Sequence, residues 1–158
     1  ATHLGYKPEH VQTVLRAMQG VTTEGTSARV FAGAGYESGG KTGTAQAVTI
    51  GQKDRYDASK LEEHQRDHSL YVAFAPMEQP RVALAVVVEN AGFGSAHAAP
   101  IARRVFDYLL MDQYPNAQDL AAVQKGLASS PIGTPLKASE MPWPPTEKAA
   151  EASPRTAP

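Results

Sequence analysis

The residues best suited to chemistry lie in one stretch, GYESGGKTGTAQ, residues 35–46. Its first eight letters match the phosphate-loop pattern G-x-x-x-x-G-K-S/T, in which backbone N–H groups bind a phosphate at the start of a helix. The same stretch brings together an ammonium group, two hydroxyls and a glycine, at Lys41, Thr42, Gly43 and Thr44. A phosphate loop and a strand that uses these four residues need different surroundings, so the neighbouring elements decide between the two interpretations.

The surroundings argue against a phosphate loop, which needs a buried strand before it and a helix after it. The preceding segment, ARVFAGA at 28–34, is too short and its residues are too small for a central strand. The segment after Thr42 has poor helix propensity and is interrupted at Gly51. Residues 82–89, VALAVVVE, could imitate the strand that carries an acidic magnesium ligand, here Glu89, but we expect them in a hairpin. The sequence therefore disfavours a nucleotide-binding protein.

Two apolar segments predict an antiparallel hairpin. SLYVAFAP alternates between two faces, whereas RVALAVVVEN is apolar on both, as in a central strand. Only MEQP or so separates them, which is too short for the crossover that parallel strands require. Together with KTGTAQAVTI, they predict an antiparallel sheet of at least three strands, at about 39–49, 69–76 and 81–89.

Two helices are expected to pack on this sheet, at 8–20 and 98–111. Pro8 suits the first turn of a helix and Gly20 a stop. Apolar residues recur at helical spacing in both helices, namely Val11, Val14, Leu15 and Met18 in the first and Ile101, Val105 and Leu109 in the second. Arg103 and Arg104 are expected on the outward, solvated side. The predicted fold class is therefore α+β, an antiparallel sheet flanked by helices.

If they lie on a strand, the four residues from Lys41 to Thr44 can each contribute to binding and reaction of a substrate. Lys41 and Gly43 face one side of the sheet, and the two threonines face the other. The glycine leaves room for a substrate against the strand, and the lysine supplies positive charge near a reacting hydroxyl. The threonine hydroxyls can bind a carboxylate, and a backbone N–H can donate to an oxyanion. This combination is the K-T-G box of enzymes that transfer acyl groups through a serine.

The wider sequence resembles one family that carries this box. KTGTAQ, residues 41–46, is the form typical of class B penicillin-binding proteins. Residues 66–110 resemble the C-terminal part of the elongation transpeptidases of Gram-negative bacteria, the penicillin-binding protein 2 subfamily, because YVAFAP, the hairpin, VVVENAGFG and the closing helix occur in the same order. The charged segment 54–68 also resembles this subfamily more than the division transpeptidases. The resemblance extends over about residues 5–112.

The resemblance implies a fold and a reaction. The fold is the C-terminal sheet portion of a penicillin-binding transpeptidase domain, which is similar to serine β-lactamases. D,D-transpeptidases of this family attack the D-Ala–D-Ala end of a peptidoglycan stem peptide with a serine, form an acyl-enzyme, and pass the acyl group to an amine. β-Lactams acylate the same serine. No cofactor and no metal are implied.

The resemblance also assigns roles to the box. Lys41 would provide electrostatic stabilisation and proton transfer, and Thr42 and Thr44 would contact the substrate carboxylate beside Gly43. The Thr44 N–H would be one oxyanion donor. Ala45 and Gln46 would belong to the substrate-binding strand.

The family's other two motifs, S-x-x-K and S-x-N, are not recognisable. Ser38-Gly39-Gly40-Lys41 matches S-x-x-K in letters, but two glycines oppose the helix that must place serine and lysine one turn apart. No S-x-N occurs, and Tyr114-Pro115-Asn116, a match to the Y-x-N variant, lies after the closing helix. We therefore expect this chain to be a fragment of a longer protein, without the nucleophile and inactive alone.

The resemblance implies partners and a location as well. The expected partners are the stem peptide, β-lactams, the N-terminal part of the same protein and a membrane glycan polymerase of the elongation machinery. The expected location is the periplasmic face of the inner membrane, with an anchoring helix outside this chain. The net charge of −1 gives no sign of nucleic-acid binding, and the lack of cysteine excludes disulfides and thiolate metal sites.

The composition divides the chain into two regions. The resemblance implies that residues 1–112 form the C-terminal part of a transpeptidase domain, and eight of the twelve prolines lie between Pro115 and Pro158. Residues 113–158 are therefore expected to be a largely disordered Pro/Ala-rich tail, with a possible short helix at 116–127.

Three other interpretations remain open. His64 and His68 have a spacing used in metal sites, with Glu63 and Asp67 nearby, but solvated histidines or a structural hydrogen bond from His68 are the simpler expectation. The chain could instead belong to a serine β-lactamase or a D,D-carboxypeptidase, although the charged insertion and the KTGTAQ form argue against this. It could also be a non-catalytic homologue that acts as a binding module.

Overall fold

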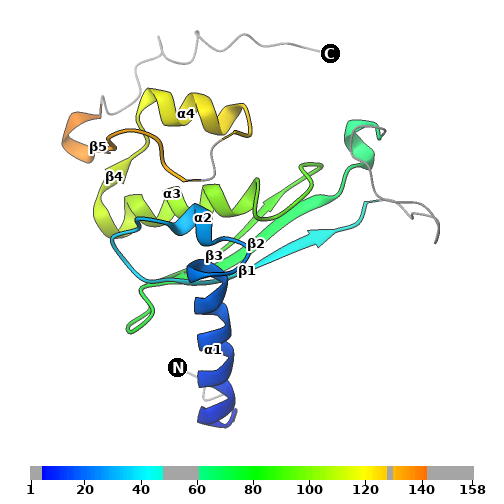
Figure 1. Ribbon diagram of the computed structural model, residues 1–158, viewed down its shortest axis with the longest axis vertical. Helices are drawn as coiled ribbons and strands as arrows, with labels where there is room; N and C mark the ends of the chain where they lie inside the picture. The colour runs from blue at the N-terminus through cyan, green and yellow to red at the C-terminus, as the bar shows by residue number, and fades with distance from the viewer. Residues whose placement is uncertain (1–4, 48–60, 128–129, 142–158) are drawn as a thin grey trace.

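The computed structural model describes residues 5–47, 61–127 and 130–141 (Figure 1). Its main sheet has three antiparallel strands in the order β1-β2-β3, with bounds Gly39–Ala45, His68–Ala75 and Val82–Val88. The two long helices are α1 (Pro8–Thr23) and α3 (Ala98–Met111), and a short α2 (Ala28–Phe31) packs against both of them. The predicted α+β class, an antiparallel sheet flanked by helices, is confirmed.

The core lies between one face of the sheet and α3. Its buried side chains come from α2, β2 and α3, namely Val30, Phe31, Tyr71, Ala73, Ala75, Ala98, Ala99, Ala102 and Phe106. Alanines on α3 let the helix approach the sheet closely, and the rings of Phe31 and Tyr71 stack with their centroids 6.1 Å apart. This core fixes β2, and through β2 it fixes the strand that carries the Lys41–Thr44 box.

The position of β3 differs from the expectation. Its apolar character on both faces suggested a central strand, but β2 is central and β3 lies at an edge of the described sheet. Val87 on its outer face is 59% exposed, while Val82, Leu84, Val86 and Val88 pack against the core. A strand's apolar pattern reports the character of its two faces and not its place in the strand order.

The arginines of α3 were wrongly expected to be solvated. Arg103 is 6% exposed, and its Nε donates to both carboxylate oxygens of Asp107, at 2.8 and 2.9 Å. Its Nη1 donates to the carbonyl of Val30 at 2.9 Å. The buried guanidinium is stable because an acid one helical turn away and backbone carbonyls satisfy its donors. The side of α3 that faces solvent instead carries apolar residues, Ile101, Val105 and Leu109.

Tyr36 joins this buried group from the segment before β1. Its hydroxyl donates to Asp107 Oδ1 at 2.8 Å, and its ring meets Phe106 edge-on at 6.0 Å. Burial raises the pKa of Tyr36, and the negative charge of Asp107 raises it further. The contact ties the approach to β1 directly to α3.

Only the C-terminal turns of α1 contact the sheet. Thr22 is buried, and its hydroxyl donates to the carbonyl of Ser38 at 2.6 Å, just before β1 begins. Val11 and Val14, which we expected to face the sheet, are 39% and 58% exposed where α1 projects from the body (Figure 1). No helix among the described residues is long and apolar enough to cross a membrane.

The region after α3 contains regular structure in its described part. β4 (Gln113–Tyr114) pairs with β5 (Leu136–Lys137), and α4 (Ala117–Gln124) confirms the short helix predicted at 116–127. These elements lie at the end of the molecule opposite to the free end of α1 (Figure 1). The disorder expected for 113–158 therefore does not describe 113–127 or 130–141, and 142–158 lie outside the described residues.

Candidate active site

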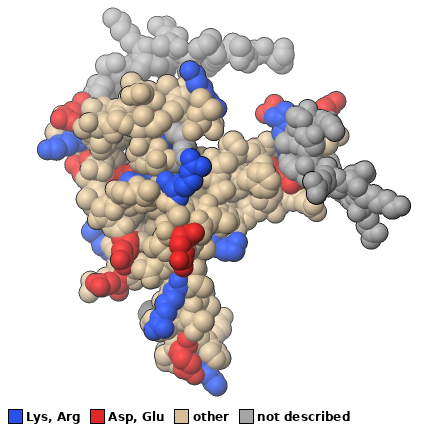
Figure 2. Space-filling model, viewed as in Figure 1, with Lys and Arg blue, Asp and Glu red and all other residues tan. Residues whose placement is uncertain are grey.

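The Lys41–Thr44 box lies on a strand at the edge of the sheet. β1 pairs with β2 on one side, and no described strand pairs with its other side. Alternate backbone N–H and C=O groups of an edge strand are available to an extended ligand. Charged side chains are sparse over the strands in the view of Figure 2. The strand can therefore form one wall of a site for a peptide.

The two faces of β1 carry different groups, as the sequence predicted. Lys41 pairs with Val72, and Thr42 pairs with Tyr71, so these two neighbours point to opposite faces. Lys41 is exposed, and its Nζ donates to the carbonyl of Thr42 at 2.7 Å. Thr42 is half-buried on the core side, and Thr44, on the same side, is exposed. The strand therefore carries the hydroxyls of Thr42 and Thr44 on one face and the ammonium of Lys41 on the other. All three groups are hydrogen-bond donors that suit an anionic ligand.

The end of the box strand is open to solvent. Ala45 is the last residue of β1, Gln46 follows it, and both are exposed. The expectation that 39–49 form the strand holds to Ala45, and residues 48 and 49 lie outside the described residues. An exposed strand end leaves both residues accessible to a ligand that continues along β1.

The side chain of a tyrosine packs under the box strand and determines how closely the strand approaches the core. Tyr71 is fully buried, and its hydroxyl forms a hydrogen bond of 2.8 Å with Ser27 Oγ. Burial raises the pKa of Tyr71, and the hydrogen bond with Ser27 partly offsets this. Gly40 is required here, because a Cβ at this position would collide with the Tyr71 hydroxyl and lie 2.6 Å from its ring carbon Cζ.

A second close approach supports the box from the loop that leads into α3. A Cβ on Gly94 would overlap the carbonyl oxygen of Leu70 and lie 2.7 Å from that of Gly43. The buried Ser69 holds this loop, since its hydroxyl donates to the Phe93 carbonyl at 3.1 Å and accepts from the Ala98 N–H at 3.1 Å. The middle of the box is therefore fixed from below by backbone contact.

Thr26 lies beside the box, and no sequence pattern indicated this position. Its hydroxyl oxygen is 3.2 Å from that of Thr42. Thr26 belongs to a Gly-, Ser- and Thr-rich segment that the sequence marks as a loop, and a loop pattern does not show which strand it contacts. The structure therefore adds a third threonine to the hydroxyls at this edge.

The structure shows where the letter matches to S-x-x-K and Y-x-N lie. Ser38 is 3% exposed and directly precedes β1, without the helix that S-x-x-K requires. Asn116 is the N-cap of α4, where its Oδ1 accepts from the N–H of Asp119 at 2.9 Å. Neither match contacts the box through a hydrogen bond that the structure records, so neither supplies the missing nucleophile or its partner.

The histidines do not form a metal site in the described part of the chain, where no cluster of three ligands occurs. The side chain of His64 is 73% exposed. His68 Nδ1 accepts a hydrogen bond of 3.0 Å from the backbone N–H of Asn90, which follows β3 at the same open end of the hairpin. The structural hydrogen bond considered for His68 is thus confirmed.

Comparison with known proteins gives consistent matches. Residues 2–107 match the penicillin binding protein transpeptidase domain. The chain is 39% identical over 94 residues to the peptidoglycan D,D-transpeptidase MrdA of Haemophilus influenzae, and 47% identical over 81 residues to MrdA of Acinetobacter baumannii. These matches include 60% and 51% of this chain but only 14% and 12% of the two relatives.

A solved structure agrees with the sequence relatives. The crystal structure of Pseudomonas aeruginosa PBP2 in complex with WCK 5153 matches with a TM-score of 0.54 and 36% identity, over 71% of this chain and 22% of that one. The match therefore extends over most of this chain and less than a quarter of the solved one. The family match, over residues 2–107, includes the sheet and the box strand.

Proposed function

Because this chain belongs to the penicillin-binding protein transpeptidase family, we propose that it forms one wall of the active site of a peptidoglycan D,D-transpeptidase of the penicillin-binding protein 2 type. The chain spans only 14% and 12% of the two MrdA relatives, so the activity is proposed for the full-length protein. The observation that carries the proposal is the box of Lys41 to Thr44 on an open edge strand within the matched region.

The proposed reaction assigns each group of the box a task. A serine outside these residues attacks the carbonyl carbon of the penultimate D-Ala, and the bond to the terminal D-Ala breaks. The hydroxyls of Thr42 and Thr44 donate to the carboxylate of that terminal residue. The Thr44 N–H donates to the carbonyl oxygen as it becomes negative, where a pre-oriented donor lowers the barrier most.

The remaining residues of the box complete the wall. Lys41 contributes positive charge that favours the ionised state of a neighbouring hydroxyl during proton transfer. Gly43 keeps the strand surface clear for the substrate, and Ala45 and Gln46 extend it. An amine of a neighbouring stem peptide then attacks the carbonyl carbon of the acyl-enzyme. The ester bond to the serine breaks, and the new amide bond is the cross-link.

The same family assignment suggests the ligands, the partners and the location of the full-length protein. The proposed ligands are stem peptides that end in D-Ala–D-Ala, and β-lactams that acylate the same serine. The proposed partners are a preceding part of the same protein, which supplies the serine and the S-x-N motif, and a membrane glycan polymerase. The proposed location is the periplasmic face of the inner membrane, with an N-terminal membrane anchor.

The role of the box can be tested in the full-length protein with a fluorescent penicillin. We expect the second-order rate constant of acylation to fall about 10- to 100-fold in T42V and in T44V, because each loses a hydrogen bond to a charged group. T13V is the matched control, since Thr13 is an exposed threonine on α1 whose hydroxyl donates to the Glu9 carbonyl.

Three results would contradict parts of the proposal. A full-length protein that forms no adduct would remove the transpeptidase assignment. Box variants that react as fast as T13V would remove the assigned roles of Thr42 and Thr44. Rapid release of hydrolysed penicillin, in place of a lasting adduct, would favour the β-lactamase alternative.

A further inference from the structure

The segment between α1 and α2 is held rigidly on both sides of Thr26. Before it, Gly25 packs so closely on α1 that a Cβ would lie 2.8 Å from the Val21 Cα, and its N–H donates to the Gly20 carbonyl at 2.8 Å. After it, Ser27 is fully buried and bonds to the Tyr71 hydroxyl at 2.8 Å. Thr26 is exposed between these two anchors, so its backbone position is fixed although its side chain reaches solvent.

Among the described residues, Thr26 forms one recorded side-chain hydrogen bond, and its partner is Thr42. The two hydroxyl oxygens are 3.2 Å apart, and either can be the donor. Thr42 is half-buried on the box strand, and the pair lies at the edge of the sheet. The bond therefore joins a fixed loop to the side chain proposed to bind substrate.

A bound carboxylate would determine the direction of this hydrogen bond. A hydroxyl carries one proton, and an ionised carboxylate can only accept. If Thr42 donates its proton to the carboxylate, the bond between the threonines must have Thr26 as its donor. Two hydroxyls in series then point at the ligand, and each hydrogen bond polarises the next.

We propose that Thr26 is a positioning residue for the box, which orients the Thr42 hydroxyl toward the carboxylate of the substrate or of a β-lactam. The inference rests on the proposed function, because it acts through the role given to Thr42. It makes Thr26 a determinant of the preference for ligands with a free carboxylate.

The test compares two forms of one penicillin, the free acid and its methyl ester, in the full-length protein. We expect T26V to lower the acylation rate constant about fivefold for the acid and to leave that for the ester unchanged, because only the acid accepts from the pair as an anion. T26S keeps the hydroxyl and should behave as wild type. T23V is the matched control, since Thr23 is an exposed threonine at the C-terminal end of α1 whose hydroxyl donates to the Gln19 carbonyl at 3.2 Å.

A double-mutant comparison shows whether Thr26 acts through Thr42. We expect T26V to have no further effect on the preference for the acid once T42V is present. The inference is overturned if T26V matches wild type with both ligands, if it slows both ligands equally, if T26S is as impaired as T26V, or if T26V and T42V act independently.

The outcomes separate this inference from the proposed function. If wild type forms no adduct, or T42V keeps the full preference for the acid, the proposed function or the role of Thr42 fails and the inference fails with it. If T42V loses the preference and T26V retains it, the Thr26 inference alone is wrong.

Discussion

Two glycines determine how closely the box strand approaches its supports. Gly40 lies on the Tyr71 hydroxyl, and Gly94 lies on the backbone of Leu70 and Gly43. The first contact is with a side chain and the second is with main-chain atoms, which can move only if a strand moves. At residue scale, Gly94 is therefore the less replaceable of the two.

We expect G94A to lower the free energy of unfolding by about 1–3 kcal/mol, the usual cost of adding an atom to a filled space. The added Cβ would lie 2.7 Å from the Gly43 carbonyl oxygen, and β1 must shift to accommodate it. Urea denaturation of the chain, followed by circular dichroism, measures the change.

G20A is the control for this substitution. At Gly20, within α1, the nearest atom to an added Cβ is Glu24 Oε1 at 3.8 Å. Because alanine is the better helix former, G20A should raise stability by about 0.5–1 kcal/mol. A neutral G94A, or a loss of equal size in both variants, would show that the close contact at Gly43 has no energetic importance.

Individual residues were predictable from sequence only where a motif named them. Lys41 to Gln46 could be selected because their order is informative by itself. Thr26 could not, since its relation to Thr42 arises from a contact across 16 positions. Arg103 was misjudged because its burial depends on carbonyl groups of Val30 and Ala32, which local sequence does not place near it.

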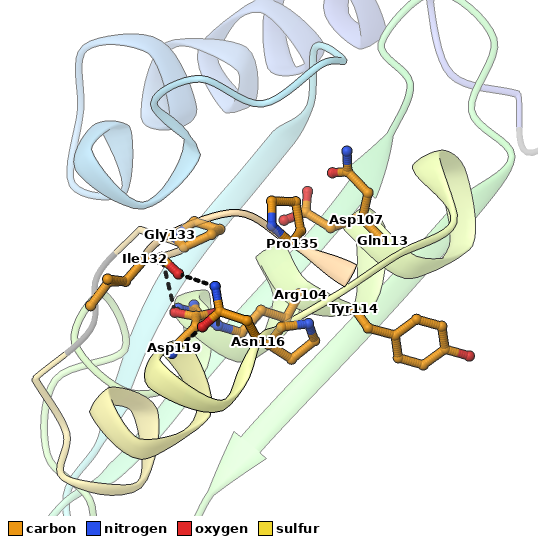
Figure 3. A pocket seen from close by; sticks show the side chains of 11 residues that line it. Arg104, Asp107, Gln113, Tyr114, Asn116, Asp119, Ile132, Gly133 and Pro135 are labelled. Atoms are coloured by element: carbon orange, nitrogen blue, oxygen red, sulfur yellow. Dashed lines mark hydrogen bonds and ion pairs between the residues drawn. The ribbon is translucent and has the colours of Figure 1, made fainter. Parts of the chain in front are cut away.

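At the scale of elements, α4 and the segment around β5 are attached to α3 by a buried ion pair. Asp119 is 1% exposed, and its Oδ2 accepts from Arg104 Nε at 3.0 Å. Its Oδ1 also accepts from the Ile132 N–H at 3.0 Å, and Asn116 Nδ2 donates to the Ile132 carbonyl at 2.8 Å. Figure 3 shows these side chains meeting between α3, α4 and the segment of residues 131–135.

D119A should release this attachment without unfolding the sheet. It leaves the Arg104 guanidinium, whose side chain is 10% exposed, without its carboxylate partner, at a cost of about 3 kcal/mol. We expect amide hydrogen exchange in α4 and β5 to accelerate about 100-fold while β2 and β3 keep wild-type rates.

E140A is the control, because it removes an exposed carboxylate from the same region. It should leave exchange in α4 within about twofold of wild type. Equal exchange in D119A and wild type would mean that the ion pair does not hold these elements in place.

The elements themselves were mostly predictable, because their patterns are local. The hairpin followed from two apolar runs and a short linker, and both long helices followed from helical spacing and terminal prolines. The order of strands was not predictable, and neither was the packing of the elements after α3, although the short helix α4 was predicted. The first depends on which face is covered, and the second depends on the Arg104–Asp119 contact between distant residues.

At the scale of the whole molecule, the proposed function makes the box one wall of a larger site. The outer face of the sheet exposes Val72 and Val87, at 46% and 59%, and the residues described here provide no S-x-x-K helix. The family match extends over residues 2–107 and reaches the box, but the MrdA relatives are several times longer than the matched part. Under the proposed function, catalysis belongs to the full-length protein, in which this chain supplies one wall of the site.

The most direct measurement is the intact mass of two samples after incubation with benzylpenicillin, namely the 158-residue chain and the full-length protein. The account predicts one covalent adduct on the full-length protein, located by peptide mapping on a serine outside residues 1–158, and none on the chain alone. An adduct on any serine within the chain, or none on either sample, would contradict it.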